Sequence, residues 1–331
     1  MADTRIELLG LDPVAYQPSR LHDCGRTFRE ANCYVDIWLE LLHALGIEPA
    51  SALAFTCAVD FEGDQWTFFK PPPEDLENLY GIDVHEMQLY RPTTEHVTEL
   101  LRCGRTMILE ADAFYLPDTA STSYRQAHVK SSIMVEAIDV GGERLRYFHG
   151  AGYYELSGED FRGVFRLGRE FSCDVLPPYV EVVRFDARPR LEGGELREAA
   201  GKLLQRHLGR RPKRNPWLKF GERLSADFPN LLAGTEAHYH AYAFATIRQS
   251  GSAFELAGDF VEWLAGPGEA QAAVARGALG RQVANAKALL FRLARRRSFD
   301  AGPQIRQLAE DWEIAQGALE LLCQPIHIST R

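Results

Sequence analysis

A cysteine at the start of a helix-like segment is the residue best placed to act as a nucleophile. Cys33 follows Asn32 and opens CYVDIWLELLHALG, in which apolar residues recur at helical spacing up to Gly46. Asn32 is a good N-cap, so we expect Cys33 at the first helical position. Free backbone amides and the helix dipole favour a thiolate there and can bind an oxyanion, with Asn32 assisting. A small buried cysteine at a helix start is the alternative.

His128 is the candidate base for this thiol. It follows the polar run STSYRQA and precedes VKSSIMVEAID, which alternates like a strand. A histidine at a strand edge beside a loop can face a cleft and accept a proton from a nucleophile. The next strand-like run, RLRYFHGAGYYEL, brings His149 to a comparable level. A capping or surface histidine is the alternative for His128.

These candidates lie in a chain with the composition of a globular protein. It has 331 residues, of which 46% are hydrophobic, and a formal charge of −9 that argues against non-specific nucleic-acid binding. The N-terminus shows no basic leader, and no run of about 18 uncharged apolar residues occurs. We therefore expect a cytoplasmic protein without membrane or nucleic-acid partners. The six cysteines are scattered, and most are expected to be reduced and buried.

The predicted secondary structure that would position Cys33 and His128 changes from mixed to helical along the chain. Residues 31–187 are mixed, with strand-like runs in the segments SALAFTCAVDF, RTMILEADAFYL, VKSSIMVEAID, RLRYFHGAGYYEL and YVEVVRF. The last three are expected to form an antiparallel meander, and TFFKPPPEDLENLYGID a loop leading into a short helix. After LEGG, long segments carry helical periodicity. We predict an α+β protein with a sheet-containing domain over 1–190 and an α-helical domain over 191–331.

The order of a helix-borne cysteine, a histidine before a strand and a polar group on the next strand is that of papain-like enzymes. Residues 31–165 resemble the bacteriocin-leader peptidase branch of that fold and, more closely, the N-terminal domain of the butirosin-biosynthesis acyltransferase. The matching elements are Asp112, the YLP triplet beginning at Tyr115, and His128. REANCYVDIWLELLHALG, ADAFYLPDT, YFHGAGYYEL and HAYAFATIRQSGSAFELA also resemble a bacterial family of unknown function whose members occur near carrier-protein and nonribosomal-peptide genes.

The papain-like resemblance implies acyl transfer. Cys33 would attack an acyl or aminoacyl thioester on the phosphopantetheine of a carrier protein. His128 would activate the thiol and later deprotonate the acceptor, a small-molecule amine or a second carrier. Papain-like enzymes place Asn or Asp where this chain has His149, so either His149 or Asp112 is expected to orient His128. Tyr115 is a candidate substrate contact.

The sequence is also compatible with two functions other than acyl transfer. A cysteine peptidase or amidase would use the same groups, because transfer differs from hydrolysis only in whether water is excluded. A catalytically inactive scaffold that binds a carrier protein is the second.

A basic segment in the C-terminal half is a candidate for binding a partner protein. Residues 202–223 are strongly basic, and we expect them to dock an acidic carrier protein, although a solvated helical face is the plain alternative. The docking candidates are Arg210, Arg211, Lys213, Arg214 and Trp217.

No metal or resident cofactor is expected. His238 and His240 lie two residues apart on a predicted helix, where side chains two apart point in different directions. The dinucleotide, P-loop, nucleophile-elbow and zincin motifs do not occur in the sequence.

Overall fold

The computed structural model describes residues 5–169, 172–187 and 189–323. The chain divides into two compact units. The first, here called the sheet unit, comprises Met1–Asp23, Asn32–Pro49 and Pro73–Arg190. The second, the helical unit, comprises Cys24–Ala31, Ala50–Pro72 and Leu191–Arg331. The chain leaves the sheet unit for the last time after Arg190, and two earlier segments also belong to the helical unit.

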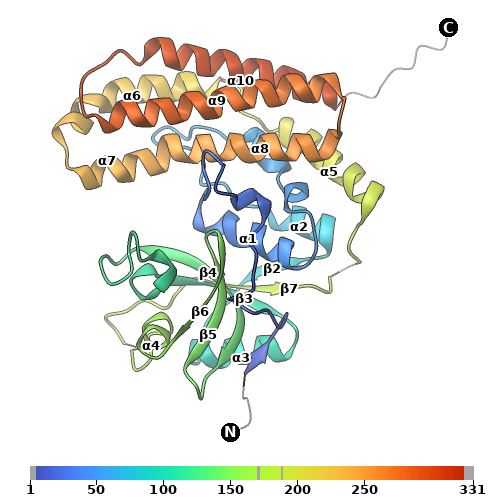
Figure 1. Ribbon diagram of the computed structural model, residues 1–331, viewed down its shortest axis with the longest axis vertical. Helices are drawn as coiled ribbons and strands as arrows, with labels where there is room; N and C mark the ends of the chain where they lie inside the picture. The colour runs from blue at the N-terminus through green and yellow to red at the C-terminus, as the bar shows by residue number, and fades with distance from the viewer. Residues whose placement is uncertain (1–4, 170–171, 188, 324–331) are drawn as a thin grey trace. The chain divides into compact units, whose positions relative to one another are not determined.

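An antiparallel sheet forms the centre of the sheet unit (Figure 1). Its strand order is β2-β7-β3-β4-β5-β6, and β1 pairs with β4 outside this path. The strands are β1 (Ile6–Glu7), β2 (Asp83–Glu86), β3 (Thr106–Asp112), β4 (Lys130–Asp139), β5 (Arg144–His149), β6 (Gly152–Ser157) and β7 (Val180–Arg184). The mixed α+β class with an antiparallel sheet is thus confirmed.

Three strand predictions need correction. The run RLRYFHGAGYYEL is a hairpin of β5 and β6 rather than one strand, because Gly150 turns the chain at a φ of 47°. The run YVEVVRF forms β7, which lies between β2 and β3 rather than beside the β5–β6 run that precedes it in the predicted meander. The apolar run SALAFTCAVDF contains short helical turns at Pro49–Ala52 and Ala54–Ala58. A continuous apolar run does not distinguish a buried strand from a buried helix.

Helices cover both faces of the sheet. One face carries the apolar side chains of alternate residues such as Leu109, Ile133 and Tyr147, which join α3 and α4 in one core cluster. The helix α1 packs against β4, β5 and β6. The helices of this unit are α1 (Cys33–Ala44), α2 (Pro73–Tyr80), α3 (Thr93–Arg102) and α4 (Glu159–Val164), so the predicted helix at Cys33 and the short helix after the triple proline are confirmed.

A buried group of charges fixes α1 to the segment that precedes it. The His22 ring bonds Glu40 through Nδ1 and lies 3.4 Å from an Asp36 carboxylate oxygen through Nε2. The side chains of all three are at most 2% exposed. Burial alone would lower the pKa of His22, but hydrogen bonds and charge attraction from Asp36 and Glu40 together raise it to about 9. His22 is therefore a buried cation at neutral pH, held by two residues of α1.

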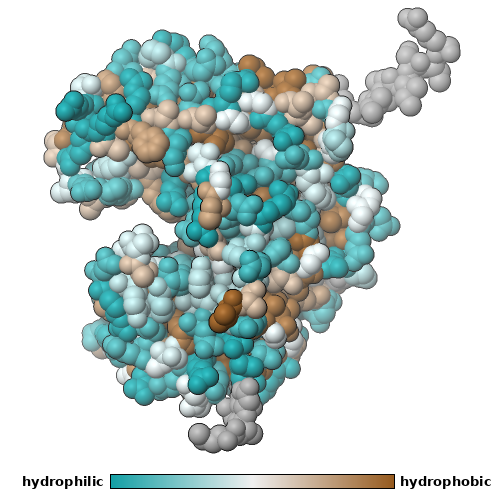
Figure 2. All heavy atoms as spheres, viewed as in Figure 1, coloured by the Kyte–Doolittle hydropathy of each residue, from teal (hydrophilic) through white to brown (hydrophobic). Residues whose placement is uncertain are grey.

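The helical unit confirms the helical character expected after residue 190. Its long helices surround an aromatic core in which Trp66 and Trp217 lie 4.7 Å apart, centroid to centroid. The helices are α5 (Gly193–Leu208), α6 (Pro216–Ala233), α7 (Glu236–Ala243), α8 (Gln249–Ala265), α9 (Ala270–Ala294) and α10 (Gly302–Leu322), with a π-helical turn at Phe244–Arg248 between α7 and α8. None of the helices among the described residues is both long and apolar enough to cross a bilayer. The visible surface is largely hydrophilic, with scattered apolar areas (Figure 2).

The cysteines differ from the expectation that most are buried. All six are free thiols, but only Cys57 is buried. Cys24, Cys103 and Cys173 are exposed, and Cys33 has intermediate exposure. Burial raises the pKa of the Cys57 thiol, which makes it a poor nucleophile.

Candidate functional site

The local prediction for Cys33 is confirmed. The helix α1 begins at Cys33, and the buried Asn32 side chain caps it by accepting from the backbone N–H groups of Tyr34 (3.1 Å) and Val35 (3.0 Å). These two amides are therefore committed to the cap, so the prediction that neighbouring amides bind an oxyanion is wrong for them. The N–H of Cys33 itself donates to no acceptor in the described part of the chain. It is the amide open to an oxyanion.

The thiol of Cys33 faces a serine of the sheet. Its Sγ lies 3.7 Å from Oγ of Ser132 on β4, a distance typical of a weak thiol hydrogen bond. Ser132 pairs in register with Glu110 of β3. The sequence did not single out Ser132, because its partner lies 99 positions away along the chain.

His128 is oriented by Asp112. Its Nδ1 lies 2.6 Å from Oδ2 of Asp112, and its ring stacks on Phe114 at a centroid distance of 4.5 Å. The Oδ1 of Asp112 accepts from the Phe114 N–H, which holds the carboxylate in place. A carboxylate acceptor requires the proton on Nδ1 of a neutral ring, so Nε2 carries the basic lone pair. His149 and Asp112 were the two candidates to orient His128, and Asp112 is the one that contacts it.

Cys33 and His128 are not joined by a hydrogen bond within residues 5–169. The strand register nevertheless relates their partners. Asp112 pairs with Lys130 and Glu110 with Ser132, so Asp112 and Ser132 are diagonal neighbours on one face of the sheet. Diagonal neighbours have Cβ atoms about 7–8 Å apart or somewhat less. The Cys33–His128 dyad therefore stays a prediction. Cys33 contacts Ser132 and His128 contacts Asp112, and these two partners are neighbours on one face of the sheet.

His149 belongs to a different group of side chains. Its Nδ1 lies 2.5 Å from Oδ2 of Asp118, and its Nε2 lies 2.6 Å from Oγ of Ser131. The Tyr147 hydroxyl donates to the other Asp118 oxygen at 2.5 Å. Burial and the Asp118 charge raise the pKa of Tyr147 well above its usual value, so this hydroxyl stays protonated. His149 therefore contacts Asp118 and Ser131 and not His128.

The order Asp118–His149–Ser131 is also that of a serine-hydrolase triad. Ser131 is only 6% exposed and His149 only 7%, so a substrate has no contact with the hydroxyl in this conformation. We interpret the group as a buried network that joins β4 and β5 to the turn containing Asp118. The turn lies in the segment ADAFYLPDT, but the contacts of Asp118 were not predictable from it, because its partners His149 and Tyr147 lie about 30 positions away along the chain.

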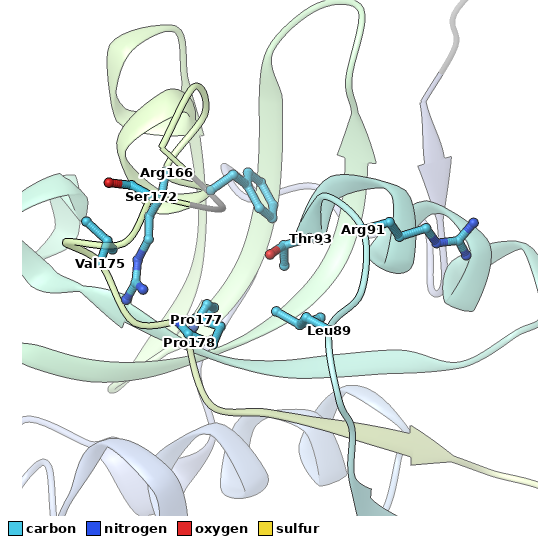
Figure 3. A pocket seen from close by; sticks show the side chains of 9 residues that line it. Leu89, Arg91, Thr93, Arg166, Ser172, Val175, Pro177 and Pro178 are labelled. Atoms are coloured by element: carbon cyan, nitrogen blue, oxygen red, sulfur yellow. The ribbon is translucent and has the colours of Figure 1, made fainter.

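Two pockets lie beside the His128 end of the sheet unit. The larger, of about 640 Å³, is lined by Asp112, Tyr115 and His128 together with α4 and the segment that follows it. The predicted substrate contact Tyr115 lies flat against Gly163 of α4, where an added Cβ would come within 2.1 Å of the ring. The smaller pocket, of about 260 Å³, is more apolar (Figure 3).

Both halves of the chain match models of one family. The DUF1839 N-terminal domain matches residues 17–185, and the DUF1839 C-terminal domain matches residues 193–321. The chain belongs to the DUF1839 family. None of the curated proteins compared with it matches. Membership identifies the two domains but assigns no chemistry to this DUF1839 chain.

Several side chains of the basic segment 202–223 in the DUF1839 C-terminal domain already have partners within the protein. Arg211 pairs with Glu320 and Arg214 with Glu222. Trp217 is fully buried, and its Nε1 donates to Gln282 at 2.8 Å. Its assignment to a docking surface is wrong, because a tryptophan at helical spacing fills the core of the bundle instead. Arg210 and Lys213 are exposed and form no ion pair among the described residues.

The histidines of α7 show no metal-site geometry in the DUF1839 chain. The His240 ring contacts Glu236 one turn away at 3.4 Å, and both side chains are exposed. Across the described residues, no group of three or more potential ligands converges on one point.

Proposed function

We propose that this DUF1839 protein is a cysteine-dependent acyltransferase of the cytoplasm that takes an acyl or aminoacyl group from the phosphopantetheine thioester of a carrier protein. One observation carries the proposal. Cys33 is the first residue of a capped helix, its own amide is uncommitted, and the Asp112-held His128 lies on the same side of the sheet's β3–β4 pair. The arrangement is compatible with the papain-like relationship, which is part of the proposal.

The chemistry requires two steps at one sulfur atom. The Cys33 thiolate attacks the thioester carbonyl, the Cys33 N–H stabilises the oxyanion, and the phosphopantetheine thiolate leaves as the acyl-enzyme forms. An acceptor amine then attacks the acyl-enzyme, and the Cys33 thiolate leaves. The free Nε2 of His128 takes the amine proton in this second step. Cys33 and His128 are not hydrogen-bonded to each other among the described residues, so in this proposal the thiol acts in the first step and the histidine in the second.

A carrier-binding scaffold without catalysis is the second candidate. The observation that favours it is that Ser132, and not a histidine, is the side chain bonded to the Cys33 thiol. Water in place of the amine would make the same site a thioesterase or peptidase.

Intact-mass measurement with acyl-loaded carrier protein separates these functions. We expect the wild-type chain to gain the mass of the acyl group and Cys33→Ala to gain none. The exposed Cys103 provides the matched control, since Cys103→Ala should acquire the adduct at the wild-type rate. A wild-type chain that binds the carrier without acquiring the adduct would establish the scaffold. Release of free acid alone, with a panel of amines supplied, would exclude transfer in favour of hydrolysis.

Charge reversal at Arg210 and Lys213, which form no ion pair among the described residues, tests whether a carrier protein docks on the helical unit. The double variant Arg210→Glu/Lys213→Glu should weaken carrier binding several-fold at low salt, because each exposed charge contributes about 0.2–1 kcal/mol. The loss should shrink at high salt, where exposed charges are screened. The matched control is Arg295→Glu/Arg297→Glu, which reverses two exposed cations elsewhere on the same unit. Equal effects of the two double variants in a binding titration would refute docking at this site.

A further inference from the structure

The two pockets of the sheet unit share two lining residues, Arg166 and Val175. The smaller pocket has mostly apolar walls, among them Leu89, Phe165 and the Pro177–Pro178 pair (Figure 3). The larger pocket carries the polar groups, including His128. An apolar chamber therefore adjoins a polar one, and Arg166 lines both.

Arg166 occupies a backbone position that favours glycine. It follows the last turn of α4 with a φ of 55°. Its N–H donates to the Gly163 carbonyl at 3.1 Å, and the Leu167 N–H donates to the Arg162 carbonyl at 2.9 Å. This pair of bonds defines a Schellman motif, in which the left-handed residue is usually glycine. A side chain here costs about 1–2 kcal/mol, so the arginine is unfavourable for the backbone.

The Arg166 guanidinium retains donors for a ligand. It donates to the Leu176 carbonyl and forms no ion pair with a carboxylate among the described residues. A guanidinium has five N–H donors, and most of them remain available. The side chain runs toward the Pro177–Pro178 segment, whereas the Arg91 guanidinium points away from the other lining residues (Figure 3). Arg166 is thus the cation placed to meet an anion at this pocket.

The charges around the larger pocket limit the kind of anion. Its lining carries three carboxylates, Asp112, Glu159 and Asp174, and three arginines, Arg162, Arg166 and Arg169. Asp112 is paired with His128, Glu159 with Arg125 and Arg162 with Glu143. Arg166 and Arg169 then stand against Asp174, an excess of one positive charge that a single carboxylate can neutralise. We propose that the two pockets together bind a small monocarboxylate whose compact apolar group fills the smaller pocket while its carboxylate bonds Arg166. This site does not depend on the function proposed for Cys33.

Calorimetric titration with hexanoate tests the site in the full-length chain. We expect hexanoate to bind. Hexanol and hexylamine should bind at least about tenfold more weakly, since a charge-assisted bond contributes about 1.5–3 kcal/mol. Inorganic phosphate should also bind more weakly, because it has no apolar chain to fill the smaller pocket. Arg166→Gly should weaken hexanoate binding by a similar factor. Its thermal midpoint should be unchanged or higher, because glycine relieves the left-handed backbone.

The matched control is Arg296→Gly, which replaces another arginine of positive φ, 50°, in the helical unit. It should leave hexanoate binding unchanged, as should Cys33→Ala. Three results would each overturn the site: no hexanoate binding by the wild type at millimolar concentration, equal binding of hexanol, or full binding by Arg166→Gly. The acyl-adduct assay does not measure hexanoate binding. A failure of the carboxylate site therefore shows in the titration, and a failure of the acyltransferase proposal shows in the adduct assay.

Discussion

Asp118→Ala is expected to lower the free energy of unfolding by about 3 kcal/mol, since it leaves two buried groups without their shared acceptor. The Asp118 side chain is 6% exposed and bonds both His149 and Tyr147. Neither partner can turn to water, because Tyr147 is fully buried and His149 nearly so. This network links β5 to the turn after β3, so its loss should loosen the centre of the sheet unit.

Asp112→Ala is the matched comparison, because Asp112 also bonds a histidine but at the surface. The Asp112 side chain is 28% exposed and that of His128 is 70% exposed. Water replaces a partner lost from such a site, so we expect a stability change below about 1 kcal/mol. Its effect should fall instead on the acyl-adduct assay, as slower release of the acyl group to an amine. Urea unfolding followed by circular dichroism measures both variants, and equal losses of stability would contradict the assignment of one network to structure and the other to function.

The second large effect concerns pH. The pKa of His22 rises from 6.5 to about 9 on folding because Asp36 and Glu40 hold its cation. A group with a raised folded pKa stabilises the protein fully below its unfolded pKa and loses that contribution as pH passes the folded pKa. We therefore expect stability to fall by about 3 kcal/mol as pH rises from 6.5 through 9. The helix that carries Cys33 is the element that loses its attachment.

Urea midpoints measured across this pH range test the prediction. His22→Gln should be less stable than wild type below pH 6.5 and should lack the decline toward pH 9. His43→Gln, which alters an exposed histidine of α1 outside this group of charges, should retain the wild-type profile. If His22→Gln keeps the full decline, the buried cation is not its cause.

Local signals predicted the elements that bear the candidate chemistry. Asn32 followed by helical spacing placed the start of α1 at Cys33, since a cap acts within one turn. Alternation in VKSSIMVEAID predicted β4, and the triple proline predicted the loop before α2. Where local information was ambiguous, in SALAFTCAVDF, the strand prediction failed.

The sequence by itself therefore determined the α+β class, the capped cysteine and the passage to helices near residue 190. Only the tertiary structure decided which side chains meet. Asp112 rather than His149 bonds His128, Ser132 faces Cys33, and Trp217 lies in the core rather than at the surface. The reason is physical: capping depends on adjacent residues, whereas partners across a sheet depend on strand register, and a shift of one residue moves every side chain to the opposite face.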